Sequence, residues 1–545
     1  MQLIVKTMAI ILLLTTTLAS ANEPEIRIQG LNGKQQTNVR AFLSLTQENC
    51  KSPAWRINNL FTKADNEIVK ALRALGYYQP NTNKKLTFKN DCWQARFDIK
   101  TGKPVRVSNL IVQVQGEAQQ EPVFQKLLSN LPIKPGDILK HARYEKIKQD
   151  LRSIALEYGY LDHQLIKKSL VVKPELLQAE IELIVDSGPR HRFGKISIDQ
   201  DILNPDFVQR FVFIDEDDDY SSKQLVKTYN ALADSLYFSN VELKPQMDAI
   251  ENDSVPIDII LTPQKTHDFS VGAGYDTDIG PLGSFSYLNR RLNRKGHHLS
   301  LALQISPVLS SAEGNYVIPF TEPRTDHVAI GLGYKYEKPN TFESQSALLS
   351  VRYQHLYQTG WQQNLFLKLT HEKFTISDVS QNTTLLIPGV RWQYTESNHP
   401  LRPTQGYHLD LSIAAAPEVL FSDVAFVQAS VTGKLITALP WPAILIARTN
   451  LGATLTSDFE RLPPSQRFYA GGTETIRGYN YKELAPQDSQ GTVIGGRMLA
   501  VASLEYEQFI TESWGASAFI DAGNAFELNQ FKIKYGAGIG VRWLS

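Results

Sequence analysis

Arg477 and Asp521 are the residues of this chain whose types and setting most clearly suggest a specific interaction. Arg477 lies in a long polar loop, and Asp521 lies in a strand-like segment further along the chain. From residue 514 to 522 the apolar side chains occupy the even positions, so the aspartate faces away from the apolar side. A guanidinium and a carboxylate that meet in a polar interior can form a short, bidentate, charge-assisted bond. We therefore expect an Arg477–Asp521 pair that fixes the loop.

A second acidic side chain is placed to share this arginine. Ser503, Glu505 and Glu507 occupy the polar face of the preceding strand, opposite Leu504 and Tyr506. Because strand residues two positions apart share a face, Glu505 is predicted to be a second acceptor for the arginine. The alternative is an arginine that stays solvated in the interior, which costs little free energy if water reaches it.

The elements around these residues have the two-residue period of β-strands from residue 266 onward, as in residues 298–305 and 407–414. Long strands with one apolar and one polar face suit a transmembrane β-barrel, because lipid lies outside and water or a plug lies inside. A soluble β-sandwich would show the same alternation. Strand lengths of roughly ten residues and aromatic residues near strand ends favour the barrel.

The N-terminal residues have the order of a secretory signal peptide. Lys6 precedes an apolar run over residues 8–14, and small residues follow at 19–21, so we expect residues 1–21 to be removed on export. Beyond them, no apolar stretch reaches the roughly 18 to 20 residues of a spanning helix. Lysine plus arginine and aspartate plus glutamate both total 56, so no net field points to nucleic acid as a partner.

The two cysteines of the chain, Cys50 and Cys92, both lie in the first segment after the signal peptide. Because an exported chain meets an oxidising compartment, we expect them to form a structural disulfide. The closed loop of about 42 residues would destabilise the unfolded chain by on the order of 3 to 4 kcal/mol. Free buried thiols are the alternative.

The segment between the signal peptide and the predicted barrel repeats a pattern of strands and helices. Amphipathic helices end near Gly76, Gly159 and Leu236, a spacing that suits small domains and is too long for a solenoid repeat. In each unit a strand precedes the helices, and further strands follow them. The sequence predicts three small α+β domains followed by the barrel, at residues 22–103, 104–188, 189–265 and 266–545.

Two short motifs in the predicted barrel resemble the signature of a known family. They are an Arg-Gly-aromatic loop and a Phe-x-Asp-x-Gly strand, formed by Arg477, Gly478, Tyr479, Phe519, Asp521 and Gly523. Together they resemble the outer-membrane assembly-factor superfamily, whose barrels insert other barrels or pass polypeptides across the membrane. The resemblance implies a membrane β-barrel in the outer membrane. It also implies that three polypeptide-transport-associated (POTRA) domains precede the barrel and lie in the periplasm.

The C-terminal strand departs from the family pattern. Residues 535–543 alternate as an outward-facing strand should, and the chain stops at Ser545. The alternating segments number about 14, whereas the resemblance implies about 16 strands. We therefore expect a truncated sequence and an incomplete barrel, whose end strands would lack partners within the hydrocarbon.

Within the superfamily, three N-terminal repeats favour the translocation and assembly module subgroup over the central barrel-assembly subunit, which typically has five. Residues 461–472 and 535–543 also resemble that subgroup. The resemblance implies a TamB-like partner that is anchored in the inner membrane and spans the periplasm. It also implies client outer-membrane proteins such as autotransporters, and contact with outer-membrane lipid.

Other function classes are alternatives. A two-partner secretion transporter would carry two periplasmic repeats and usually a plugging N-terminal helix, and the central barrel-assembly subunit is a second alternative within the superfamily. A diffusion porin needs neither the repeats nor the Arg-Gly-Tyr loop. The chain has no Gly-x-Ser-x-Gly elbow, phosphate-cradling loop or zinc-ligand spacing. We expect no enzymatic activity, no catalytic residue, no cofactor and no metal.

The first barrel strand, residues 268–276, has features of a seam that can open. Phe269 and Val271 face the lipid side, whereas Gly272 and Gly274 face the lumen. Glycine offers no side chain to hold a neighbour and leaves more backbone entropy to lose on ordering. We predict that this strand is the mobile side of a lateral seam, where main-chain bonds are exchanged with a client strand. The alternative is that the glycines relieve crowding in a curved wall.

The first α+β domain, around residues 25–100, is predicted to bind the periplasm-spanning partner. A small sheet has an exposed edge, and an added strand would gain backbone hydrogen bonds without requiring a particular sequence. The alternative is that the neighbouring domain protects this edge.

Overall fold

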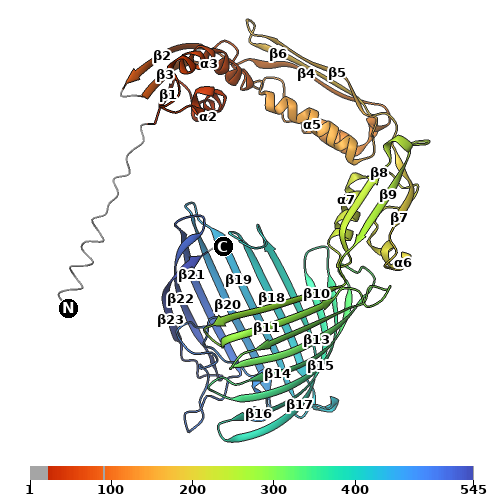
Figure 1. Cartoon of the computed structure of the whole chain (residues 1–545), viewed down its shortest axis with the longest axis vertical. Helices are drawn as coiled ribbons and strands as arrows, with labels where there is room; N and C mark the ends of the chain where they lie inside the picture. Colours follow the sequence, from red (N-terminus) through yellow and green to blue (C-terminus); the bar gives the residue numbers. More distant parts are fainter. Residues whose placement is uncertain (1–22, 90–91, 544–545) are drawn as a thin grey trace, which may run out of the picture. The chain divides into compact units, whose positions relative to one another are not determined.

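The computed structural model describes residues 23–89 and 92–543 of the chain. The predicted signal peptide, residues 1–21, lies outside the described residues, as does Ser545. Three small sheets, each of three strands, precede one large antiparallel sheet, and Figure 1 labels most of their strands by their number in chain order. No helix in the described part of the chain has the length and the apolarity needed to cross a membrane.

The first N-terminal unit packs two helices against a three-stranded sheet. Its apolar core includes Ile57, Ile68, Trp93 and Phe97, and each of these side chains is at most 1% exposed. The strand order is β1-β3-β2, with β1 parallel and β2 antiparallel to the central strand. The elements are β1 (Glu25–Gln29), α2 (Gly33–Phe42), α3 (Ala54–Ala74), β2 (Asn81–Lys89) and β3 (Cys92–Lys100).

A disulfide ties the segment before α3 to the start of β3. It joins Cys50 to Cys92, which are separated by 42 positions, as the sequence predicted. The bond connects the helical and the strand layers of the first unit, so unfolding this unit leaves a closed loop with fewer accessible conformations.

The second and third units repeat the element order and the strand order of the first. In each unit one strand is followed by two helices and two strands, and the last strand lies in the middle of the sheet. The predicted domain boundaries fall in the links between these sheets. The second unit has β4 (Arg106–Gln115), α4 (Pro122–Ser129), α5 (His141–Glu157), β5 (Gln164–Lys173) and β6 (Gln178–Asp186). The third unit has β7 (Arg192–Asp199), α6 (Pro205–Val208), α7 (Ser222–Ala233), β8 (Phe238–Pro245) and β9 (Ser254–Pro263).

The large sheet has 14 strands in chain order, β10 to β23, and every neighbouring pair is antiparallel. Within the described residues, the end strands β10 and β23 each pair with one neighbour. The first seven strands are β10 (His267–Asp276), β11 (Gly280–Asn289), β12 (His298–Ile305), β13 (Leu309–Pro319), β14 (His327–Glu337), β15 (Glu343–Leu356) and β16 (Gln362–Ile376). The remaining strands are β17 (Val379–Ser397), β18 (Gly406–Ala416), β19 (Phe426–Ala438), β20 (Ala443–Thr456), β21 (Met498–Phe509), β22 (Trp514–Phe526) and β23 (Lys534–Trp543).

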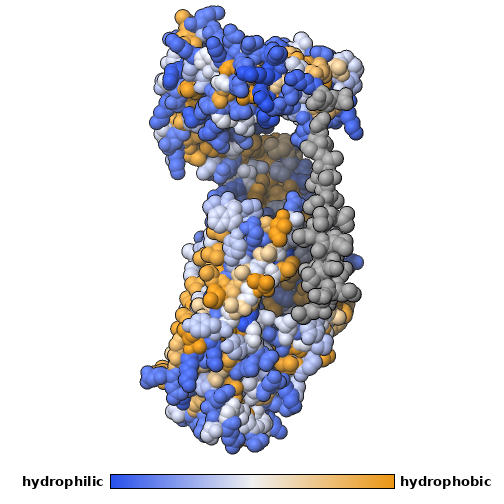
Figure 2. Space-filling view, turned by 90° about the vertical axis from the view of Figure 1, so that its left-hand side faces the viewer, coloured by the Kyte–Doolittle hydropathy of each residue, from blue (hydrophilic) through white to orange (hydrophobic). Residues whose placement is uncertain are grey.

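The two faces of this sheet reverse the pattern of a water-soluble sheet. Outward-facing Phe269 and Val271 of β10 are 64% and 80% exposed, whereas inward-facing Glu337 of β14 and Glu372 of β16 are each 2% exposed. On the side drawn in Figure 2, hydrophobic residues gather over the middle of the strand wall, and hydrophilic residues dominate its lower end. An apolar exterior and a charged interior are what a wall in contact with lipid requires.

Candidate functional site: a loop held inside the strand wall

The connection between β20 and β21, residues 457–497, packs inside the strand wall. Leu462, Ala470 and Ile476 in this loop are at most 1% exposed. Leu462 shares an apolar cluster with Leu385 of β17 and Phe426 of β19. The loop therefore lies in the lumen, where it presents Arg477 to the polar faces of β21 and β22.

Arg477 bonds to both acidic residues that the sequence placed around it. Its Nε and Nη2 atoms donate to the two carboxylate oxygens of Asp521, both at 2.8 Å, and its backbone N–H donates to Asp521 Oδ2 at 3.0 Å. Its Nη1 donates to Glu505 Oε2 at 2.5 Å, and its Nη2 also donates to Ser503 Oγ at 3.1 Å. Asp521 is 0% exposed and Glu505 is 4% exposed. Hence one arginine compensates two buried carboxylates, and the predicted Arg477–Asp521 pair is present with Glu505 as the second acceptor.

Phe519 and two glycines of β23 shape the space around the arginine. The Arg477 guanidinium carbon lies 3.5 Å from the centre of the Phe519 ring, so the ring face contacts the cation. A Cβ atom on Gly536 would lie 2.2 Å from the backbone oxygen of Arg477, and one on Gly538 would lie 2.7 Å from the Phe519 ring. Glycine at these two positions is therefore what lets the loop approach the wall.

The remaining motif residues, Gly478, Tyr479 and Gly523, determine the backbone conformation and packing of the loop and of β22. Gly478 has a φ of +95°, a left-handed conformation that glycine adopts at little cost. Tyr479 packs against an apolar cluster that includes Ile476 of the loop and Val501 of β21. A Cβ atom on Gly523 would lie 2.1 Å from the backbone oxygen of Ala500, so a side chain there would push β22 away from β21.

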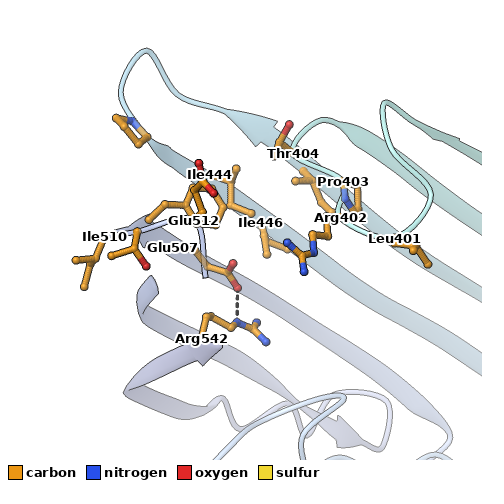
Figure 3. Close-up of a pocket in the computed structure, with 14 residues that line it drawn as sticks. Leu401, Arg402, Pro403, Thr404, Ile444, Ile446, Glu507, Ile510, Glu512 and Arg542 are labelled. Carbon is orange, nitrogen blue, oxygen red and sulfur yellow. Dashed lines mark hydrogen bonds and ion pairs between the residues drawn. The ribbon is translucent and has the colours of Figure 1, made fainter. Parts of the chain in front are cut away.

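Arg542 extends the ion-pair network to β23, the last strand of the sheet. Its Nη2 atom lies 2.8 Å from Glu505 Oε1, and its Nε atom lies 2.5 Å from Glu507 Oε1. Figure 3 shows Arg542 pointing towards Glu507 at the edge of a cavity, with their ion pair as a dashed line. The network thus joins β21 to β23 across β22. Sequence reasoning missed Arg542, although its place between outward-facing Val541 and Trp543 indicates a lumenal side chain.

A second part of the loop is anchored to β14. Lys482 Nζ lies 2.5 Å from Glu337 Oε1, and the Tyr481 hydroxyl donates to the same oxygen at 3.0 Å. Lys335 Nζ lies 2.7 Å from the other oxygen, Glu337 Oε2. This anchor was not predicted, because a glutamate at the end of a strand looks in the sequence like an ordinary loop charge.

A third part of the loop bonds to the turn between β10 and β11. The backbone N–H and the hydroxyl of Thr473 both donate to Asp278 Oδ2, each at 2.8 Å. The preceding residue, Gly472, has a φ of +97°, and a Cβ atom there would lie 2.7 Å from the same oxygen. The loop that bonds to β22 through Arg477 therefore also holds the first hairpin of the sheet.

The loop has an internal framework that is centred on Arg467. This side chain is 8% exposed, and it donates to the backbone oxygens of Leu462 at 2.6 Å, Ile494 at 2.8 Å and Glu460 at 2.8 Å. The guanidinium groups of Arg467 and Arg497 each lie 4.6 Å from the centre of the Phe459 ring. These contacts connect the two ends of the loop to each other.

The two glycines of the predicted seam lie in β10, which pairs with β11 in continuous register. Gly272 is opposite Ser284, and a Cβ atom there would lie 2.6 Å from the Ser284 hydroxyl. Gly274 has more room, because a Cβ atom there would meet Leu282 at an ordinary contact distance of 3.9 Å. A side chain at position 272 would require the Ser284 hydroxyl to rotate away, whereas position 274 has room for a Cβ atom.

An antiparallel strand wall with charges inside, apolar residues outside and its own loop in the lumen defines a transmembrane β-barrel of the outer-membrane kind. Comparison with protein families agrees, since the Omp85 superfamily domain matches residues 267–545 and the POTRA domain TamA domain 1 matches residues 25–101. The chain belongs to the Omp85 superfamily. The predicted fold class, a C-terminal membrane β-barrel preceded by POTRA domains, is confirmed. So is the predicted location, with the barrel in the outer membrane and the POTRA domains in the periplasm.

One curated relative and one solved structure show how similar this chain is to known proteins. The outer membrane protein assembly factor BamA of Nitratidesulfovibrio vulgaris is 25% identical over 367 residues, which cover 62% of this chain and 45% of that protein. The chain thus spans less than half the length of this curated relative. The crystal structure of BamA from Haemophilus ducreyi lacking POTRA domains 1-3 aligns with a TM-score of 0.66 at 17% identity, over 80% of this chain and 94% of that one. This second likeness is one of fold.

Proposed function

We propose that this chain is TamA, the outer-membrane subunit of a translocation and assembly module. In this proposal it inserts or translocates outer-membrane proteins such as autotransporters. The match of residues 25–101 to the POTRA domain TamA domain 1 supports the assignment. The three small N-terminal sheets of the described chain also support it. The function requires no cofactor and no catalytic residue, and the free energy for insertion would come from client folding or from a partner.

The observation that carries the proposal is that one lumenal loop is bonded to both end regions of the sheet. Arg477 bonds to Asp521 of β22, and Thr473 bonds to Asp278 at the tip of the β10–β11 hairpin. The hydrogen bonds of Thr473 to Asp278 lie at exposed groups and can be exchanged for hydration at small net cost, whereas the bonds of Arg477 to the buried Asp521 cannot. The loop is therefore suited to stay anchored at β22 while it holds the first hairpin and releases it, as a lateral seam at β10 with Gly272 and Gly274 would require.

The proposed partner is a TamB-like protein that is anchored in the inner membrane and binds the first POTRA domain by adding a strand. In the sheet of this domain, β1 and β2 each have one strand neighbour among the described residues. Phe88 on β2 is 49% exposed and offers an apolar contact beside that edge. Backbone hydrogen bonds at the edge would give affinity, and the neighbouring side chain would give specificity.

Co-purification tests the partner assignment. A chain that lacks residues 25–101 should lose the periplasm-spanning partner, while the barrel should still migrate as a folded, heat-modifiable species. A chain with Cys50→Ser and Cys92→Ser should retain the partner if its first domain still folds, and it serves as the matched control. Normal partner association by the deleted chain would exclude the proposed interface.

Client assembly tests the function itself. In cells that lack their own copy, the full-length wild-type protein should restore protease-accessible autotransporter at the surface, and its Arg477→Ala variant should restore much less. A general fall of outer-membrane barrel proteins in the absence of the chain would instead assign the central barrel-assembly role, which the 25% identity to BamA favours as second candidate. Release of a soluble polypeptide with no inserted client would assign a two-partner secretion transporter.

A further inference from the structure

A second polar site lies in the lumen wall, at residues that do not contact Arg477. It is a cavity of about 430 Å³ between inward-facing side chains of β15 to β19. We call it the lumenal cation site, because its charged lining residues are Arg352, Lys368, Arg391 and Asp410. Three cations and one carboxylate give the lining a net charge of +2. The rest of the lining consists mainly of serine, threonine, asparagine and glutamine side chains, which can donate hydrogen bonds.

The single carboxylate of the site already has its partners. Arg391 Nε lies 2.9 Å from Asp410 Oδ1 and 2.8 Å from Oδ2, and Gln393 Nε2 donates to Oδ2 at 3.0 Å. Asp410 is 7% exposed, so it cannot turn towards another group without losing these bonds. It therefore neutralises Arg391 and leaves two positive charges.

Arg352 and Lys368 carry these two charges, and neither has a carboxylate partner among the described residues. The Nε atom of Arg352 is buried without a hydrogen-bond partner. The Lys368 amino group lies 4.4 Å from the centre of the Phe366 ring, and the charges that act on it are those of Arg352 and Arg391. Glu372, four positions along the same face of β16, is bonded to the Ser344 hydroxyl at 2.7 Å instead.

Regular strand pairing fixes the positions of these cations. Arg352 is directly opposite Phe366, and Lys368 is directly opposite Ser350, in the β15–β16 register. The Phe366 ring fits because position 389 on β17 is glycine, where a Cβ atom would lie 2.3 Å from the ring. The site is thus built on strands and not on mobile loops, and its charges are held close together before any ligand arrives.

Clustered like charges that are half removed from water destabilise one another, so a bound anion would stabilise them. The ligand must accept several hydrogen bonds from different directions, since donors converge on the cavity from five strands. A guanidinium fork beside a lysine ammonium is the combination that proteins use for phosphate groups. We propose that the lumenal cation site binds a phosphate group, either of a phospholipid headgroup or as free phosphate.

Calorimetric titration of the full chain in uncharged detergent tests this proposal, with inorganic phosphate and glycerol 3-phosphate as probes at constant ionic strength. Arg352→Gln and Lys368→Gln should each weaken phosphate binding at least about tenfold, which corresponds to about 1.4 kcal/mol. Lys373→Gln is the matched control, because it removes the same charge from the opposite face of the same strand. Equal phosphate affinity in all four chains, or no phosphate binding by the wild type, would overturn the proposal.

Two further measurements complete the test. The first distinguishes a bound phospholipid headgroup from free phosphate, and the second uses the unmodified chain, so it does not depend on the folding of a variant. Phospholipid that stays with the delipidated wild type and is lost from the Arg352→Gln and Lys368→Gln chains would assign the lipid headgroup. Phosphate binding without such lipid would assign the free anion. In the unmodified chain, phosphate should slow acetylation of Lys368 several-fold relative to chloride and leave Lys373 unaffected. Equal reactivity of Lys368 in phosphate and in chloride would contradict the site.

Discussion

The first POTRA domain and the barrel differ in the side chains that they bury. Trp93 and Phe97 fill the interior of the POTRA domain, whereas the loop site of the barrel also buries the carboxylates of Asp521 and Glu505. The difference follows from the surroundings, because water around the POTRA domain drives apolar side chains inward and lipid around the barrel lets them face outward. The core of the POTRA domain is therefore apolar, whereas the interior of the barrel combines apolar clusters with compensated charges. We therefore expect removal of a buried lumenal charge to destabilise the barrel, and removal of buried apolar volume to destabilise the first POTRA domain.

Arg477→Ala should have the largest effect, and that effect should be confined to the barrel. The substitution leaves Asp521, which is 0% exposed, without its bidentate partner, and removal of one member of a buried ion pair costs about 3 to 5 kcal/mol. The temperature at which the barrel loses its heat-modifiable gel mobility should fall. Arg448→Ala is the control, since Arg448 also faces the lumen and has a long contact of 3.4 Å to Ser503 Oγ. An equal fall in both variants would show that lumenal charge in general, and not this pair, stabilises the barrel.

Phe97→Ala tests the other half of the comparison. The ring is fully buried in the first POTRA domain, and its truncation should destabilise that domain by about 3 to 4 kcal/mol. Hydrogen exchange of the full chain should show lost protection across residues 25–100. Peptides from β10 to β23 should exchange as they do in the wild type. Lost protection in the barrel would mean that the two regions do not fold independently.

Asp278→Ala should have a smaller effect that is local to the first hairpin of the barrel. It removes the acceptor of two hydrogen bonds from Thr473, and a net loss of about 1 kcal/mol corresponds to about fivefold faster hydrogen exchange. The faster exchange should appear in β10 and β11 and not in β21 and β22. Thr473→Val, which keeps the backbone donor, should show about half the effect in free energy. Unchanged exchange in β10 would contradict the role of the loop in holding this hairpin.

The smallest expected effect concerns pH and the contact between the first and second POTRA domains. The Tyr78 hydroxyl lies 2.6 Å from His141 Nε2, and burial lowers the pKa of His141 below its ordinary value of 6.5, partly opposed by Glu145. The unfolded state therefore takes up a proton first as the pH falls through about 6.5, and the contact loses stability below that pH. Hydrogen-exchange protection factors, which correct for the intrinsic pH dependence of exchange, should be higher around residues 76–78 and 139–144 at pH 7.5 than at pH 5.5. His141→Gln should remove this difference.

The predictable part of the site is the part that depends on strand period. Asp521 and Glu505 were assigned to the lumenal face because alternation fixes the face of a strand residue regardless of its neighbours. The partner of Glu337 could not be predicted in this way. Its bond to Lys482 depends on the path of a loop of irregular backbone, and neither periodicity nor local propensity determines such a path. Arg542 is an intermediate case. Strand alternation predicts that its side chain faces the lumen, but it does not predict which carboxylates it pairs with.

The same distinction applies to the fold: features that depend on local periodicity could be predicted, and features that depend on long-range pairing could not. Period-two segments predicted the barrel strands and their two faces, and the repeated helix ends predicted three α+β units. The order of strands inside each small sheet did not follow from the sequence, because β3, β6 and β9 reach the middle of their sheets through pairing with strands distant in the chain. Contacts of this kind depend on how the helices cover each sheet, which local patterns do not encode.

The hydrogen bonds that Arg467 donates to backbone oxygens restrict the conformations available to the loop. The acceptors are the loop's own backbone oxygens, so residues 457–497 are ordered among themselves as well as against the wall. Fixing a residue costs on the order of 1 to 2 kcal/mol of backbone entropy, which for a loop of this length exceeds what a few ion pairs can offset. If the loop keeps its internal order after leaving the wall, that entropy is not lost again on rebinding. Attachment of the loop would then cost little further backbone entropy, and its free energy would depend on the contacts between the loop and the wall, such as the Arg477–Asp521 pair.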